Sequence, residues 1–425
     1  MGGRYHRPVP ESIAAPLSRP EPAPPAPPAD EVHGFLVEMA TALGAYGVPA
    51  HRLEEAMSDV ASQLGVTAQF YASPTMIMCA VGTGLRQQLY MCRLEPGDIN
   101  LARLVLLDEV LADVGAGRNG PAYGAARVRG VLSIPPPGAL VTVASHGVIS
   151  GSTAVFLAGG VRELVVSTLL GLLVGALVAY AGRERNRARV LEFAAALVAA
   201  FLATAAAGLI GPLTPQVAML SALVPLLPGL SLTLGVTELA TRSLVSGTAR
   251  LMGAMTVLIS LGFGVALGQR LAALLPLTPE SGTRSLPLWT EPLAVLLAPV
   301  GLVVLFKARW RELPAIALAS VAAFYSARLG TQALGAEIGV CAGAFTLGCL
   351  SNAHARAKDR PMALTMLPGI LLLVPGGVGY RGVQSFLADD PVAGIDTLFS
   401  MFIIAISLVA GLLLANVAVH PRRAV

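Results

Sequence analysis

The sequence predicts a polytopic α-helical membrane protein of about ten transmembrane helices, built as two inverted five-helix repeats, with an N-terminal cytosolic α/β domain. Three observations lead to this prediction. The 425 residues are 55% hydrophobic and only 13% charged, whereas soluble globular proteins are about one-quarter charged. Apolar runs near the ~20 residues that a bilayer requires follow one another from residue 139 onward. A Pro-Gly pair interrupts two of these runs at equivalent places.

Residues 31–137 predict a small soluble α/β domain behind a Pro-rich tail. The tail, residues 1–30, contains EPAPPAPPAD and lacks the apolar core of a signal peptide, so we expect it to be disordered. In the domain, apolar residues at helical spacing alternate with short stretches bounded by Gly, Ser and Pro. These patterns predict helices at 31–47, 51–65, 98–115 and 121–132, and strands at 66–72, 75–81 and 87–93.

Ten candidate spans fill the rest of the chain after a hinge at IPPPG (134–138). Five belong to a first membrane repeat, residues 138–272, and five to a second, residues 273–425. The spans are 139–159, 164–181, 191–210, 216–236, 248–268, 290–306, 314–330, 335–353, 363–380 and 397–418.

Basic residues indicate the orientation of these spans. The loops RERNRAR (183–189), KARWR (307–311) and HARAKDR (354–360) fall on one side of a ten-span count. That side carries most of the Arg and Lys of the membrane part, and positive charge in short loops marks the cytoplasmic face. The rule therefore places this side, the N-terminal domain and the C-terminus in the cytoplasm.

The two interrupted spans are the main indication of an internal repeat. They read LVPLLPGLSLTLG (223–235) and LLLVPGGVGYRG (371–382), and their Pro-Gly pairs lie 147 residues apart. Each half holds an odd number of spans, so the second half enters the membrane from the opposite side, as in many secondary transporters. The alternative is that Pro and Gly, which are frequent in membrane helices, serve packing only.

A broken helix at membrane depth predicts a binding site for a small polar solute. Its free backbone N–H groups favour a carboxylate and its free carbonyls favour a cation. For Ser and Thr near the breaks, hydrogen bonds to their own helix are the plain alternative. The candidate substrate-binding residues are Pro228, Gly229, Ser231, Thr233, Thr237 and Glu238 at the first break, and Pro375, Gly376, Gly379 and Tyr380 at the second.

Glu238 is the most informative acid, because it follows the first break closely in a region with little charge. Ionisable groups at membrane depth are costly and indicate function. Glu238 is therefore the candidate for proton coupling or for binding a substrate ammonium. The alternative is that it lies at the cytoplasmic interface and pairs with Arg242 at i+4.

Other classes of protein find less support in the sequence. No nucleotide-binding motif is present, so transport would draw on an ion gradient or on the gradient of the substrate. We expect no cofactor, no metal site and no nucleic-acid partner. A membrane-anchored enzyme with a catalytic 31–137 domain is the competing class, but His33, His51 and Cys79 stand there without a hydrolytic motif. A third class is a channel or scaffold in which the glycine-rich breaks serve only the close packing of helices.

Three motifs carry a resemblance to a known family. They are AxxLxxYGxPAxRLEEAM (40–57), PGLSLTLGVTELATRSLVSGTARL (228–251) and LVPGGVGYRG (373–382). The chain resembles the threonine/serine exporter (ThrE) family, with the N-terminal and C-terminal modules fused. The resemblance implies a ten-span bacterial inner-membrane exporter of small hydroxy amino acids, driven by the proton gradient, and leaves a homo-oligomer open. Split relatives are associated with dicarboxylate export, so small dicarboxylates such as succinate are the alternative substrates.

The sequence departs from the family pattern after the first Pro-Gly pair. Relatives usually place a polar pair after the Thr and an Arg-Asp pair a little later. Here Leu234 follows Thr233, and Thr237-Glu238 occupies the Arg-Asp place. The acid is kept and the arginine is gone, which indicates a change of preferred substrate rather than a loss of transport.

Overall fold

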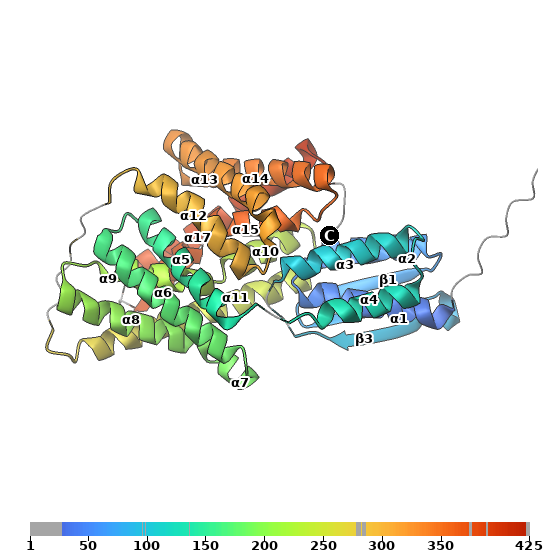
Figure 1. Ribbon diagram of the computed structural model, residues 1–425, viewed down its shortest axis with the longest axis horizontal. Coiled ribbons are helices and arrows are strands. Elements are labelled where there is room, and N and C mark those ends of the chain that lie inside the picture. The colour runs from blue at the N-terminus through green and yellow to red at the C-terminus, as the bar shows by residue number, and fades with distance from the viewer. Residues whose placement is uncertain are drawn as a thin grey trace, which may run out of the picture.

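The computed structural model describes residues 28–95, 97, 99–135, 137–277, 282, 286–373, 376–387 and 390–421. Of the predicted disordered tail, residues 1–27 lie outside this part. The protein has an N-terminal unit beside a larger helical part, which lie at opposite ends of the long axis in Figure 1.

The N-terminal unit has the elements that the sequence predicts. Strands β1, β2 and β3 form an antiparallel sheet in that order, in which Ala68 pairs with Val81 and Met76 with Arg93. The bounds are α1 (Ala29–Ala45), α2 (Ala50–Gln63), β1 (Ala68–Ser73), β2 (Met76–Val81), β3 (Gln88–Arg93), α3 (Leu101–Gly115) and α4 (Pro121–Leu132).

The apolar spacing in these elements explains their layers. Phe35, Met39 and Leu43 of α1 are completely buried, as their helical spacing predicts. Alternate residues of β2, including Ile77 and Cys79, face the same core. Helices α1 and α2 therefore cover one face of the sheet, and α3 and α4 pack on these helices from outside.

The helical part consists of thirteen helices within the described residues. They are α5 (Ala139–Phe156), α6 (Val161–Ala181), α7 (Arg185–Ala188), α8 (Leu191–Ile210), α9 (Pro215–Leu223), α10 (Gly229–Ala240), α11 (Leu244–Ala272), α12 (Thr290–Leu305), α13 (Leu313–Leu334), α14 (Ala336–Lys358), α15 (Ala363–Leu373), α16 (Gly376–Leu387) and α17 (Pro391–Ala418). The helical part also has two short 3₁₀ turns, η2 (Val224–Leu226) and η3 (Trp310–Glu312). A third, η1 (Gly84–Arg86), lies between β2 and β3 of the N-terminal unit.

The protein is a multi-pass membrane protein by the length and hydropathy of these helices. In the described part of the chain, eight helical segments are long and apolar enough to cross a bilayer, or nine if one bent pair forms a single span. Helix α12, of 16 residues, is apolar but shorter. Each predicted span falls on helical structure, and the count of ten stays a prediction.

The first predicted break is present. The segment Pro215–Leu226 and helix α10 meet at an angle of 53°. Pro225 and Pro228 have no N–H to donate to the preceding turn, so the helix gives way to a 3₁₀ turn before α10 begins. At the second predicted break, α15 is described up to Leu373 and α16 from Gly376, and the two residues between them lie outside the described part of the chain. Pro375, a predicted site residue, lies outside the described residues.

The two halves of the membrane part repeat the same helix neighbours. Helix α11 packs on α8 and α10, as α17 packs on α14 and α16, and α6 contacts α9 as α13 contacts α15. Close glycine contacts recur at a spacing of 147 residues, since Gly235 faces Leu251 and Gly382 faces Leu398. Gly264 and Gly411 are also 147 residues apart, and each lies close to the facing helix. A Cβ added at Gly264 would meet the Phe193 carbonyl oxygen, the Ala196 Cβ and the Leu197 nitrogen. A Cβ added at Gly411 would meet the same three kinds of atom, from Cys341, Ala344 and Phe345.

Candidate functional site

A cavity of about 240 Å³ lies between the first break and helices α15 and α16, and we call it the break cavity. The first break contributes Leu220, Val224 and Leu227, and α16 contributes Gly377 and Arg381. Helices α5 and α12 complete its wall. Leu227 and Gly377, which are about 150 residues apart in the chain, thus line the same cavity.

Arg381 is the one charged side chain among the described residues that line the break cavity. It is exposed, and its guanidinium makes neither a hydrogen bond nor an ion pair with another described residue. The neighbouring polar group, the Thr153 hydroxyl, donates to the Ile149 carbonyl at 2.8 Å. Arg381 lies in the second interrupted motif, LLLVPGGVGYRG, but is not among the residues that the sequence pattern predicts for the site. Its signal was an arginine inside an apolar span, five residues after Gly376.

The predicted hydroxyls of the first break lie away from the break cavity. Thr233 donates to the Gly229 carbonyl at 3.1 Å, and Thr237 donates to the Thr233 carbonyl at 2.8 Å. These are hydrogen bonds to their own helix, the alternative that the sequence left open. Pro228 is the N-cap residue of α10, and its carbonyl accepts from the Leu232 N–H at 2.9 Å.

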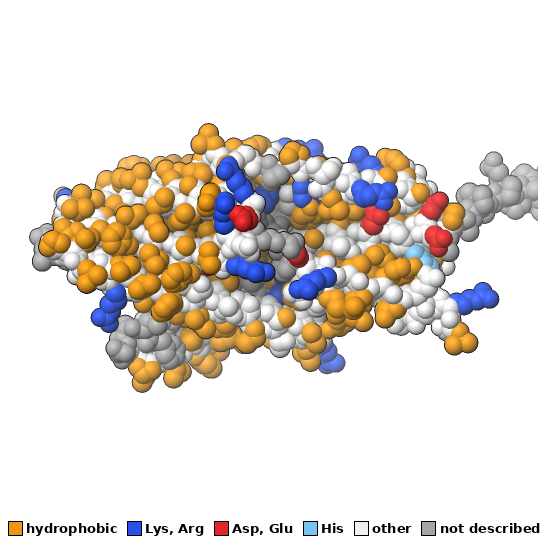
Figure 2. Space-filling model, turned by 90° about the horizontal axis from the view of Figure 1, so that it is seen from below, with side chains coloured by type: hydrophobic (Ala, Val, Ile, Leu, Met, Phe, Trp, Pro, Cys, Tyr) orange, Lys and Arg blue, Asp and Glu red, His pale blue; other side chains and the backbone are white. Residues whose placement is uncertain are grey.

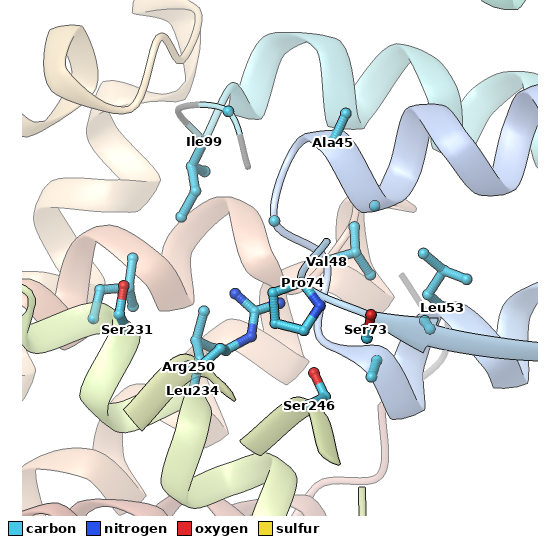
Figure 3. A pocket seen from close by; sticks show the side chains of 16 residues that line it. Ala45, Val48, Leu53, Ser73, Pro74, Ile99, Ser231, Leu234, Ser246 and Arg250 are labelled. Atoms are coloured by element: carbon cyan, nitrogen blue, oxygen red, sulfur yellow. The ribbon is translucent and has the colours of Figure 1, made fainter. Parts of the chain in front are cut away.

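Ser231 lines a second cavity of about 140 Å³, the interface cavity, between helices α10–α11 and the N-terminal unit. Figure 3 shows Ser231, Ser246 and Arg250 on one side of it, and Ser73 and Pro74 of the N-terminal unit on the other. The N-terminal unit therefore covers the half-helix that follows the first break.

Glu238 binds the N-terminal unit directly. Its carboxylate is fully buried and accepts hydrogen bonds from Arg250 Nε at 3.0 Å, from Ser246 Oγ at 2.7 Å and from the Ala50 N–H at 3.0 Å. Ala50 is the first residue of α2, and the N-cap residue Pro49 provides no side-chain cap. Glu238 thus caps α2 from another part of the chain, where the helix dipole favours a negative charge.

The alternative pairing of Glu238 with Arg242 is wrong. Arg242 follows the end of α10 and has a positive φ of 66°, so the helix no longer holds it one turn above Glu238. The partner is Arg250 on the neighbouring helix α11, whose side chain is 16% exposed. A contact between helices of this kind cannot be read from i+4 spacing.

The first turn of α2 carries further ionisable groups beside this contact. Burial, with the nearby Arg52 charge, lowers the pKa of His51 to about 4. Burial also raises the pKa of Glu54, although the hydrogen bond from the Ala72 N–H acts against this. His51, Arg52 and Thr237 line a small third cavity of about 70 Å³ at the same interface.

The remaining predicted residues of the second break lie on the far side of α16 from the cavity wall or at its start. Gly379 faces Met401 of α17 and Leu258 of α11, where a Cβ would find no room. Tyr380 is 2% exposed in the same apolar cluster, and its hydroxyl has no partner among the described residues. Gly376 begins α16.

Two further contacts hold the N-terminal unit to the membrane part. The N–H groups of Leu101 and Ala102, at the start of α3, donate to the carbonyls of Phe306 and Lys307. Arg360, in the loop after α14, pairs with Glu109 of α3. Figure 2 shows Lys and Arg side chains gathered where the two parts meet, beside a largely hydrophobic membrane part. The basic loops that follow α12 and α14 thus face the N-terminal unit.

Two family models match the chain. One, described as "Putative threonine/serine exporter", matches residues 34–272, and another, described as "Threonine/Serine exporter, ThrE", matches residues 291–418. Together they cover the N-terminal unit and both halves of the membrane part. No solved structure matches the chain.

Curated relatives are fungal membrane proteins. Pheromone-regulated membrane protein 10 of Candida albicans (strain WO-1) is 28% identical over 364 residues, covering 82% of this chain and 33% of that protein. The protein of that name from Kluyveromyces lactis is 26% identical over 419 residues, covering 91% and 43%. The one from Eremothecium gossypii is 25% identical, covering 92% and 56%. The chain therefore spans between a third and little more than half of the length of these relatives. Because the first family model alone covers more than half of the sequence, this chain belongs to the threonine/serine exporter family.

Proposed function

We propose that this protein is a secondary transporter that exports small polar amino acids of the threonine/serine class from the cytoplasm across a bacterial inner membrane. The observation that carries the proposal is the break cavity, where the first break faces α15 and α16 in a member of an exporter family. Interrupted helices that meet at mid-membrane are where secondary transporters bind their solutes.

Alternating access requires two halves that rock against each other, and inverted repeats supply such halves. The matching helix neighbours and the glycine contacts 147 residues apart support residues 138–272 and 273–425 as these repeats. Close glycine packing of α11 on α8 and of α17 on α14 would make each half a rigid body. The break cavity would then open in turn to either side.

Glu238 is the proposed site of proton coupling. Protonation would remove the negative charge that pairs with Arg250 and caps α2, and so weaken the hold of α10 on the N-terminal unit. With the basic loops, the N-terminal unit and the C-terminus in the cytoplasm, a proton at Glu238 would loosen the cover of the first break. In this mechanism the proton acts on access to the cavity and not on the solute itself.

Small dicarboxylates such as succinate are the second candidate substrates, and Arg381 in the cavity wall favours a solute with a carboxylate. A membrane-anchored enzyme is the competing class. It would need paired catalytic groups in the N-terminal unit. There the buried Cys79 thiol has a pKa raised to about 12 by burial, which disfavours a nucleophile.

Counterflow in proteoliposomes tests the proposal. Vesicles with the full chain are loaded with unlabelled threonine, serine or succinate, and uptake of the same labelled solute is followed. A carrier gives transient accumulation above the level of empty vesicles and is stimulated from the opposite side. A channel would give no such stimulation, and an enzyme or scaffold would give no counterflow, so either result would reject the proposed function.

A further inference from the structure

We propose that Arg381 binds the carboxylate of the transported solute in the break cavity and thereby sets the requirement for an acid group. This inference rests on the proposed function and adds a residue and a chemical class to it. It is carried by the charge of the cavity wall, by the open space at Gly377 of α16 and by the difference between the first break and its predicted counterpart.

The charge of the cavity wall is unbalanced. The lining side chains around Arg381 are apolar apart from Thr153, and no acid stands among the described lining residues. A guanidinium in a membrane span is costly unless an anion or water compensates it. Buried acids elsewhere in the membrane part have partners, as Glu238 does with Arg250. Arg381 therefore offers an unused charge toward a space that a small anion can occupy.

The backbone beside Arg381 points to the same ligand. Gly377 of α16, four residues before Arg381, also lines the cavity. A Cβ added at Gly377 would meet nothing within 4 Å, so a solute can approach the backbone of α16 closely there. A carboxylate can therefore lie against this wall within the same cavity as the guanidinium.

The first break offers no second arginine. The position 147 residues before Arg381 is Leu234, which faces the interface cavity and the N-terminal unit instead. A solute in the break cavity thus meets a cationic wall on the α16 side and an apolar wall of Leu220, Val224 and Leu227 on the other. This arrangement selects for a carboxylate, and the described residues of the wall provide no acidic side chain for an ammonium group.

The test compares Arg381→Gln, Arg381→Lys and the wild type in the counterflow assay with succinate, serine and threonine. Arg381→Gln is expected to raise the KM for the transported carboxylate by roughly 10- to 100-fold, the loss expected for a charged hydrogen bond. Arg381→Lys keeps the charge but not the bidentate geometry, so it restores part of the affinity. Arg270→Gln, at the end of α11 and outside the cavity wall, is the matched control.

A second measurement uses the unmodified protein. Succinate and its neutral analogue succinamide compete with the labelled solute, as do threonine and threoninamide. The acids are expected to compete at least about tenfold better than the amides. Equal competition by the amides, or a KM within twofold for Arg381→Gln while the wild type transports, would overturn the role of Arg381 and leave the proposed function standing. Absence of counterflow for every solute in the wild type would remove the proposed function and this inference together.

Discussion

The first break and its predicted counterpart between α15 and α16 differ in what surrounds them. After the first break, Thr233 and Thr237 of α10 donate to carbonyls of their own helix, Glu238 accepts from Arg250, Ser246 and Ala50, and the N-terminal unit covers this half-helix. After the second break, Arg381 faces a cavity without a partner among the described residues. The first half thus holds the contact surface for the N-terminal unit. The second half holds Arg381, a charged side chain without a partner among the described residues. The difference teaches that matching helix neighbours in the two halves do not imply a matching role.

The largest effect is expected from removing the docking contact. Glu238→Ala leaves Arg250 without its carboxylate and α2 without its cap, and breaking a buried pair in this way costs about 3–5 kcal/mol. Hydrogen exchange of peptides that span α2 is expected to accelerate, and the Tm to fall. Glu55→Ala is the matched control, because Glu55 lies on the exposed side of α2 and forms only a long ion pair with Arg52. Unchanged exchange in α2 would mean that the contacts of α3 alone hold the N-terminal unit.

Glu238→Gln tests whether Glu238 carries the coupled proton. The amide keeps the size of the side chain and removes the titratable charge. If Glu238 carries the coupled proton, export by this variant loses its dependence on an imposed pH gradient while counterflow persists. Unchanged pH dependence of export would remove Glu238 from the coupling role and leave it as an anchor.

Acid is expected to weaken the cover of the first break through His51. Burial lowers the pKa of His51 from 6.5 to about 4, so the unfolded state binds the proton more readily than the folded state. Stability from this group is therefore complete above pH 6.5 and falls as the pH drops toward 4, by roughly 3 kcal/mol at most. The measurement is the Tm of the wild type and of His51→Gln between pH 8 and pH 4. A constant difference across this range would show that His51 does not titrate as its burial predicts.

Glycine substitutions test whether the two halves share one frame. A Cβ at Gly264 or Gly411 would press on a backbone carbonyl of the facing helix, so Gly264→Ala and Gly411→Ala are each expected to cost about 1–3 kcal/mol. Equal losses of Tm would support the repeat. Gly253→Ala in the interior of α11 is the matched control, since a Cβ there meets nothing within 4 Å and Ala favours a helix. A loss of Tm in only one of the two variants would contradict a shared packing arrangement in the two halves.

The sequence predicted the parts of this fold that depend on local pattern. Period-two and helical spacing located the sheet and helices of the N-terminal unit, and Pro225 and Pro228 located the first break because proline cannot donate to the preceding turn. Local patterns in the sequence could not predict contacts between segments that are far apart in the chain. Nothing local to Glu238 indicates that the Ala50 N–H approaches it from 188 residues away. The importance of Arg381 likewise depends on the apolar helices that surround it.

The smallest effects are expected from the hydroxyls of the first break. Thr233 and Thr237 donate to carbonyls of their own helix, so Thr233→Val and Thr237→Val remove a local hydrogen bond and leave no solute contact behind. We expect a change in stability below about 1 kcal/mol and a KM within twofold of the wild type in counterflow. Ser231→Ala, on the wall of the interface cavity, is the control for a hydroxyl that faces the N-terminal unit. A large rise in KM for Thr237→Val alone would mean that α10 turns toward the solute during transport, and the two breaks would then share the binding role.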